Sequence, residues 1–80
     1  MSFMLEVYYP APQDPARERR ISTEIARHGG RLTYREAPYT PVSKAVCLTY
    51  EFECLSFAQS AAAELARLNE HVEGPVDYGQ

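Results

Sequence analysis

The sequence of 80 residues predicts a single α+β domain, spanning residues 1–80, in which strands and helices follow the order β-α-β-β-α-β. Several segments are rich in strand formers, and most of them alternate between apolar and polar positions. Two other segments have apolar residues at helical spacing, and each of these starts with a capping pattern. The chain is too short to contain a second domain.

Three strands are predicted at residues 3–9, 31–36 and 44–54, and a short fourth strand is predicted at 72–78. Pro75 cannot donate a hydrogen bond to a neighbouring strand, so we expect the fourth strand at an edge of the sheet. The side chains expected to face the core lie on alternate positions of the first three strands: Phe3, Leu5, Val7, Tyr9, Leu32, Tyr34, Val46, Leu48, Tyr50 and Phe52.

The first helix is predicted to begin at Asp14, a favoured N-cap residue that is followed by proline, and to end before Gly29. The second helix is predicted to open at Ser56, because Gln59 follows three residues later in a capping-box pattern. The residues expected to turn inward from these helices are spaced by three or four positions: Ile21 and Ile25 in the first, and Phe57, Ala58, Ala61, Ala62, Leu65 and Leu68 in the second.

This order of elements is typical of ferredoxin-like domains. Such domains have an antiparallel sheet of strand order 4-1-3-2 with both helices on one face. Right-handed crossover connections leave few other ways to close the chain. We therefore expect one face of the sheet to pack against the helices and the other face to stay open.

The net charge of −3 and the pI near 5.3 argue against a nucleic-acid partner, because general binding of nucleic acid requires a basic surface. We expect a cytoplasmic protein with no membrane partner, because no apolar run has the length of a membrane span and no signal-peptide pattern is present. Cys47 and Cys54 lack CxxC spacing and are predicted to be free thiols. Seven of the eight basic residues are arginines, which is typical of GC-rich bacterial coding.

Residues 50–69 join a strand with aromatic residues to an alanine-rich helix, and in this they resemble the third strand and second helix of RNA-recognition (RRM) domains. The resemblance covers about a quarter of the chain and implies the same topology. RRM domains stack bases on exposed aromatic residues of this strand. The corresponding positions here are Cys47 and Thr49, Ala45 replaces the basic residue, and Glu51 would repel phosphate. We therefore expect no RNA binding.

Other families of this topology differ from the chain at their functional positions. Acylphosphatases use a glycine-bearing phosphate loop after the first strand, where residues 10–13 contain two prolines and no glycine. Copper chaperones require a CxxC motif in the same place. ACT-type regulatory domains are similar in topology and size, but their ligand-binding motif is absent. No His, Cys, Asp or Glu cluster has metal-ligand spacing, so we expect neither a metal nor another cofactor.

The open face of the predicted sheet is the main candidate site. Its middle is partly apolar, and a patch of this kind on a small domain is typical of a partner surface, although an ordinary solvated face is the alternative. We expect a homo-oligomer or another protein partner, with Arg31 and Arg35 of one subunit near Glu6 or Glu51 of the next. The candidate interface residues are Met4, Glu6, Tyr8, Arg31, Arg35, Ala45, Cys47, Thr49 and Glu51.

A second candidate site for a ligand lies at one end of the predicted fold and consists of Arg17, Tyr39 and His71. The function expected from all these features is that of a non-enzymatic interaction or regulatory module. The alternative is a small enzyme of the dimeric α/β-barrel type, with a pocket between the sheet and the helices. Tyrosine hydroxyls on the core-facing side of the sheet would line that pocket.

Overall fold

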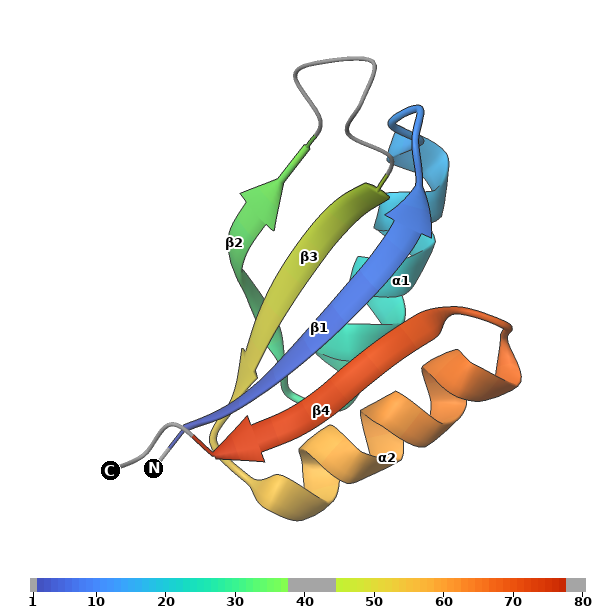
Figure 1. Cartoon of the computed structure of the whole chain (residues 1–80). Helices are drawn as coiled ribbons and strands as arrows, with labels where there is room; N and C mark the ends of the chain where they lie inside the picture. The colour runs from blue at the N-terminus through green and yellow to red at the C-terminus, as the bar shows by residue number, and fades with distance from the viewer. Residues whose placement is uncertain (1, 38–44, 78–80) are drawn as a thin grey trace.

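The computed structural model describes residues 2–37 and 45–77, whose arrangement is shown in Figure 1. The elements follow the predicted order and have these bounds: β1 (Phe3–Pro10), α1 (Pro15–Arg27), β2 (Arg31–Glu36), β3 (Ala45–Phe52), α2 (Leu55–Arg67) and β4 (His71–Asp77). The strands form one antiparallel sheet of order β2-β3-β1-β4, and both helices cover the same side of it. The predicted ferredoxin-like α+β fold is therefore confirmed.

The two central strands, β1 and β3, carry most of the core. Their register places Leu5 opposite Tyr50 and Val7 opposite Leu48, with all four side chains on the helix side. The inward faces predicted for these strands and for α1 are confirmed. The buried residues are Phe3, Leu5, Val7, Tyr9, Ile21, Ile25, Val46, Leu48, Tyr50, Phe52, Ala58, Ala61 and Leu65.

Helix α1 begins and ends where the sequence predicted. The Asp14 side chain accepts a hydrogen bond of 3.1 Å from the backbone N–H of Arg17, which satisfies one of the free donors of the first turn. At the other end Gly29 has a φ of 81°, a left-handed conformation that glycine adopts without strain. The N–H of Gly30 then donates to the carbonyl of Ile25 at 3.0 Å and closes the helix.

Helix α2 differs from the prediction at its start and along its apolar stripe. It begins after the N-cap residue Cys54, whose side chain makes no capping hydrogen bond, so the predicted capping box at Ser56 is wrong. Ala58 is buried as expected, but Phe57 is 55% exposed and Leu68 is 46% exposed. Phe57 lies about 100° around the helix from Ala58, and Leu68 is the C-cap residue, so neither can reach the core.

A β-bulge reverses the orientation predicted for the second half of β2. Leu32 is opposite Tyr50, whereas Tyr34 is opposite the next residue of β3, Thr49. β2 therefore has one extra residue, Thr33, at this point. Because strand side chains alternate, one extra residue moves every later side chain to the other face. Tyr34 therefore lies on the open side and is exposed, and its predicted core position is wrong. Leu32 remains on the helix side but is also exposed, because β2 is an edge strand.

Strand β4 forms the other edge of the sheet, as its proline predicted. It also contains a bulge, because Met4 is opposite Val76 whereas Glu6 is opposite Glu73. Gly74, within this bulge, has a φ of 105°, and a Cβ atom there would lie 2.8 Å from the carbonyl oxygen of Met4. Only glycine fits this position, since both the conformation and the space exclude a side chain.

Candidate functional site

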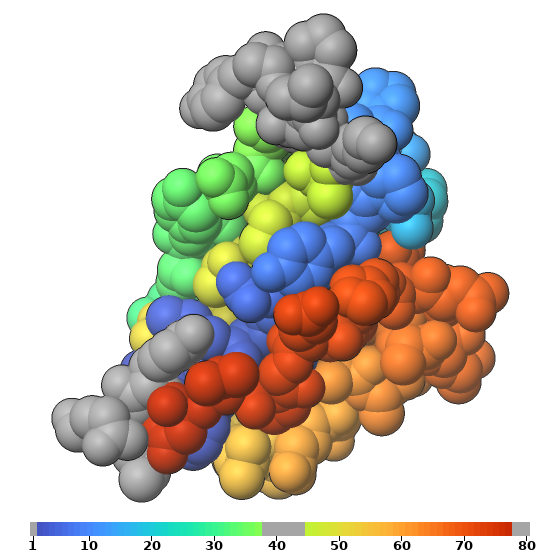
Figure 2. Space-filling model, viewed as in Figure 1, coloured from blue at the N-terminus to red at the C-terminus, as the bar shows by residue number. Residues whose placement is uncertain are grey.

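The helices leave one side of the sheet uncovered. Figure 2 views this side, with atoms of the strands at the front and α1 largely behind them. The residues whose side chains lie here, called the open face below, follow from the alternation of β1 and β3 and from the pairing of the edge strands. They are Met4, Glu6, Tyr8, Arg31, Tyr34, Glu36, Ala45, Cys47, Thr49, Glu51, His71, Glu73 and Val76.

The register arranges most of the open face in three rows that cross the sheet from β2 to β4. The Tyr8 row consists of Glu36, Cys47, Tyr8 and His71. The Glu6 row consists of Tyr34, Thr49, Glu6 and Glu73. The Met4 row consists of Arg31, Glu51, Met4 and Val76. Neighbours within a row are close enough to interact, because opposite Cβ atoms of antiparallel strands lie about 4.5–5.5 Å apart.

All the predicted interface residues except Arg35 lie on the open face. Arg35 follows the bulge in β2, and its guanidinium reaches α1 on the helix side of the sheet. There it donates to Glu18 at 2.8 and 2.9 Å and to the side-chain oxygen of Gln13 at 2.6 Å. The prediction that Arg35 lies on the open side is wrong, because the extra residue at Thr33 inverts the rest of the strand.

Without that arginine the open face is acidic. It carries four carboxylates, and Arg31 is the only arginine or lysine on the part of this face that the structure describes. Arg31 already pairs with Glu51 of the same chain. Glu6 and Glu73 are directly opposite each other in β1 and β4, an arrangement in which like charges repel. A partner that offers hydroxyl groups or positive charge to these carboxylates would relieve this repulsion.

Tyr8 lies at the centre of the open face. Its hydroxyl donates to Glu6 Oε1 at 3.3 Å, and its ring meets the ring of His71 edge-on with centroids 5.8 Å apart. The neighbouring Cys47 thiol, and then burial, raise the pKa of Tyr8 above its usual range. Burial also raises the pKa of Cys47, so this thiol is protonated at neutral pH and is a weak nucleophile. The centre of the face is therefore uncharged, with carboxylates around it.

The second predicted site, formed by Arg17, Tyr39 and His71, is not assembled by the described residues. Arg17 lies on the helix side and makes a bidentate ion pair with Glu70, at 2.9 Å for the shortest contact. His71 points to the open face, where its Nε2 lies 3.1 Å from Glu73 Oε2. Tyr39 lies outside the described residues. Arg17 and His71 therefore lie on opposite sides of the sheet and do not form the predicted ligand site together.

The tyrosines expected to line a pocket under the sheet have three different surroundings. Tyr9 and Tyr50 are buried, and their hydroxyls bond to α1. The hydroxyl of Tyr50 lies 3.0 Å from the Ser22 hydroxyl, and that of Tyr9 donates to Glu18. Tyr34 lies on the opposite side of the sheet. The three hydroxyls therefore do not converge on one site.

A polar network that the sequence did not reveal connects Tyr9, Glu18 and Arg35. The Tyr9 hydroxyl donates to Glu18 and accepts the backbone N–H of Asp14 at 2.8 Å. The Arg35 guanidinium holds the pKa of Glu18 below its usual range, and the Tyr9 hydroxyl acts in the same direction. Burial, followed by the bond to Glu18, raises the pKa of Tyr9. No periodic pattern in the sequence links these three positions. The contact forms because the bulge in β2 turns Arg35 toward α1.

The Arg35→Gln variant should lose stability at neutral pH but not in acid. We expect a cost of about 1 kcal/mol at about pH 7, since Arg35 is partly exposed and the bond is screened. The pKa of Glu18 is lower in the folded than in the unfolded protein. The stabilisation is therefore present above about pH 4 and is lost as the pH falls through the lowered value. Urea unfolding at several pH values measures this difference.

Arg31→Gln provides the matched control for this prediction. It removes the same charge from the same strand, but the Arg31 side chain is 64% exposed in its pair with Glu51. We expect its effect to stay below about 0.5 kcal/mol at every pH. An Arg35→Gln cost that increases in acid would contradict the assignment of Arg35 as the main partner of Glu18.

Cys47 and Cys54 are both free thiols, as predicted. Cys54 caps α2 and does not belong to β3, so the predicted strand was two residues too long at this end. Within residues 2–37 and 45–77, no group of three or more His, Cys, Asp or Glu side chains is placed to hold a metal ion. No helix of these same ranges is both long enough and apolar enough to span a membrane.

No protein-family model matches the chain, and no curated protein matches it at a significant level.

Proposed function

We propose that the protein is an interaction module that self-associates through the open face of its sheet. The observation that carries the proposal is that the rows of this face are complementary to themselves. A chain of 80 residues buries a small share of its surface, so covering a partly apolar face with a second copy adds stability. The excess of carboxylates on the face supports a protein partner and disfavours nucleic acid. The two free thiols fit a reducing compartment such as the cytoplasm.

Complementarity follows from a two-fold axis that lies in the interface, parallel to the strands and between β1 and β3. This axis places β1 over the partner's β3 and β2 over the partner's β4, while each row stays over itself. In the Glu6 row, Tyr34 then faces the partner's Glu73, and Thr49 faces the partner's Glu6. A hydroxyl donor is thus opposite each of these two carboxylates.

The other two rows are matched in the same way. In the Tyr8 row, Glu36 faces the partner's His71, and Cys47 faces the partner's Tyr8. In the Met4 row, Glu51 faces the partner's Met4. No carboxylate of the described rows is opposite another carboxylate, and the uncharged Tyr8 and Cys47 side chains form the centre of the interface.

The twist of the sheets preserves this pairing. Face-to-face sheets cross at about 30°, and the edge strands lie about 7 Å from the axis. Facing residues of the edge strands are therefore displaced from each other by about 4 Å along the strand direction. Successive rows are separated by about 6.7 Å, which is larger than this displacement. A two-fold axis perpendicular to the strands that crosses the sheet at the Glu6 row would instead place Glu6 on the partner's Glu6 and Glu73 on the partner's Glu73. Repulsion between these charges favours the parallel axis.

Introducing a carboxylate opposite Glu73 should weaken the dimer, and reversing the charge of Glu73 should restore it. Tyr34→Glu creates two like-charge contacts in each dimer, one at each end of the interface. We expect the dissociation constant to rise about tenfold, which corresponds to about 0.7 kcal/mol at each contact. Tyr34→Glu combined with Glu73→Arg should return the constant to within a few-fold of that of the wild type. Sedimentation equilibrium measures all these constants.

Glu53→Arg is the matched control for the rescue. Glu53 is exposed in the turn between β3 and α2 and is not one of the open-face residues, so its reversal changes the net charge by the same amount as Glu73→Arg without facing Tyr34. Combined with Tyr34→Glu, it should leave the dimer weak. The proposal fails if the wild-type protein is monomeric at about 100 μM, where weak specific pairs already associate. It also fails if Glu53→Arg rescues as well as Glu73→Arg.

A further inference from the structure

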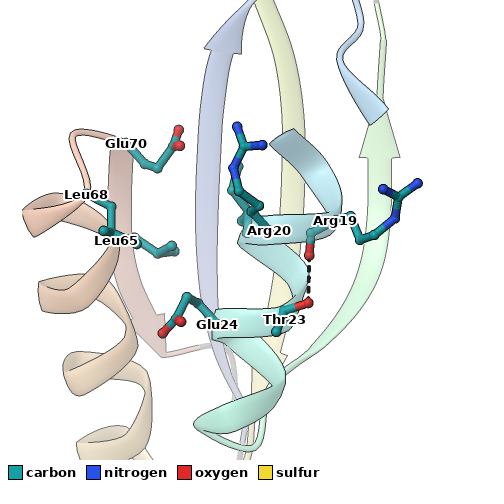
Figure 3. A pocket seen from close by; sticks show the side chains of 8 residues that line it. Arg19, Arg20, Thr23, Glu24, Leu65, Leu68 and Glu70 are labelled. Carbon is teal, nitrogen blue, oxygen red and sulfur yellow. Dashed lines mark hydrogen bonds between the residues drawn. The ribbon is translucent and has the colours of Figure 1, made fainter. Parts of the chain in front are cut away.

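A groove lies between α1 and α2, on the side of the sheet opposite the open face (Figure 3). Its volume is about 470 Å³, which is within the range of about 300–1,000 Å³ that is common for small-molecule sites. The residues that line it come from both helices and from the turn before β4: Arg19, Arg20, Ile21, Thr23, Glu24, Leu65, Leu68 and Glu70.

The groove has an apolar lining between its charged ends. Ile21 of α1 and Leu65 of α2 are core residues whose outer surfaces reach the groove. Leu68 adds an exposed wall, because the helix ends there and its side chain does not reach the core. An aliphatic chain in the groove would cover this leucine, which gives the apolar part of a ligand a favourable environment.

The unpaired charge in the groove is positive. Both carboxylates that line it are already bound to arginines: Glu70 pairs with Arg17 at 2.9 Å, and Glu24 pairs with Arg27 at 3.2 Å. Arg20 makes no hydrogen bond or ion pair with the described residues. Figure 3 shows its side chain on the groove side of α1.

Arg19 differs from its neighbour in direction. Its side chain points away from α2 and toward β2 (Figure 3). Its backbone carbonyl accepts a 2.8 Å hydrogen bond from the Thr23 hydroxyl. Arg19, like Arg20, is exposed and makes no ion pair with the described residues. The two arginines therefore have the same charge and are both exposed, but only the side chain of Arg20 lies on the groove side of α1.

We propose that this groove binds a small aliphatic carboxylate, with its carboxylate on the Arg20 guanidinium and its chain along Ile21, Leu65 and Leu68. Guanidinium and carboxylate groups form charge-assisted bonds in a two-pronged geometry, which selects a planar anion. The paired Glu24 and Glu70 disfavour dianions, because a second negative charge would approach their carboxylates. The ligand class is thus a monoanion with an apolar chain.

Titration of the 15N-labelled protein with octanoate tests the site. Amide shifts should change in α1 and α2 around Arg20 and Leu68 and should leave the open face of β1 and β3 unaffected. We expect Arg20→Gln to weaken octanoate binding about tenfold, and Arg19→Gln to change it less than about threefold. Octan-1-ol, which has the chain but no charge, should bind wild type and Arg20→Gln equally.

The proposal would be overturned by the absence of saturable shifts with octanoate, by equal weakening in Arg19→Gln and Arg20→Gln, or by octylamine binding as tightly as octanoate. Shifts confined to the open face would also refute it. Because the groove and the open face lie on opposite sides of the sheet, the titration is repeated on the Tyr8→Glu variant. Octanoate binding that persists in this variant separates the ligand site from the proposed self-association, so that each can fail alone.

Discussion

The Tyr8→Glu variant should be monomeric at concentrations at which the proposed wild-type dimer forms. The proposed two-fold axis, parallel to the strands, would place Tyr8 over the partner's Cys47, so the substitution would put two carboxylates into the centre of one interface. Each would lose water without gaining a partner, and each would also approach Glu6, which now accepts a bond from Tyr8. We expect the dissociation constant to rise at least about 100-fold, or roughly 3 kcal/mol. Sedimentation equilibrium measures the change directly.

Two matched variants separate the interface from other effects of the substitution. Tyr8→Phe keeps the ring and loses only the hydroxyl, so its dissociation constant should stay within a few-fold of the wild-type value. Gln59→Glu adds the same charge on an exposed position of α2 and should leave the dimer intact. Circular dichroism of Tyr8→Glu should retain the wild-type spectrum, because the side chain is outside the core. A dimeric Tyr8→Glu variant with this spectrum would exclude the open face as the interface.

Gly30→Ala should strongly destabilise the protein. A Cβ atom at this position would lie 2.5 Å from Phe52 Cζ and 2.6 Å from Ile25 Cγ2. Both of these side chains are buried, so relief requires movement of the core or of the backbone between α1 and β2. We expect a loss of about 2–3 kcal/mol, a large part of the stability of a small domain. Urea or thermal unfolding measures it.

The adjacent Gly29 offers an internal control with a different physical cause. Its φ of 81° is unfavourable for alanine, but a Cβ atom there would meet only Phe57, at 3.7 Å. Gly29→Ala should therefore cost about 1 kcal/mol, and Gly29→Asn less, because asparagine tolerates the left-handed conformation. At Gly30 asparagine should be no better than alanine. Equal rescue by asparagine at both glycines would show that conformation and not space limits Gly30.

The two proposed sites are compatible within one molecule. Association through the open face covers one side of the sheet, whereas the groove between α1 and α2 opens on the other side (Figures 1 and 3). A dimer built on the parallel two-fold axis would carry two separate grooves facing outward. We therefore expect octanoate to leave the dissociation constant of the dimer unchanged, and sedimentation equilibrium with and without octanoate provides the check.

Features that depend on a few neighbouring residues were predictable from the sequence. The alternation around Val7 and Leu48 identified the inner faces of β1 and β3, since successive side chains of a strand point to opposite sides. Asp14 and Gly29 marked the ends of α1, because capping is a contact within one turn. The order of the elements then allowed few closed topologies, and so the strand order of the sheet was predictable as well.

Features that depend on contacts between distant segments required the folded structure. One extra residue at Thr33 moved Arg35 from the open face to Glu18, and this slip depends on how β2 pairs with β3. The same slip made the open face acidic and brought Tyr34 onto it. The groove at Arg20 depends on the separation of α1 and α2, which pack on the core side chains of β1 and β3. Alternation and capping are local, whereas register and helix spacing are set by the whole packed core, and a pattern within one segment does not contain them.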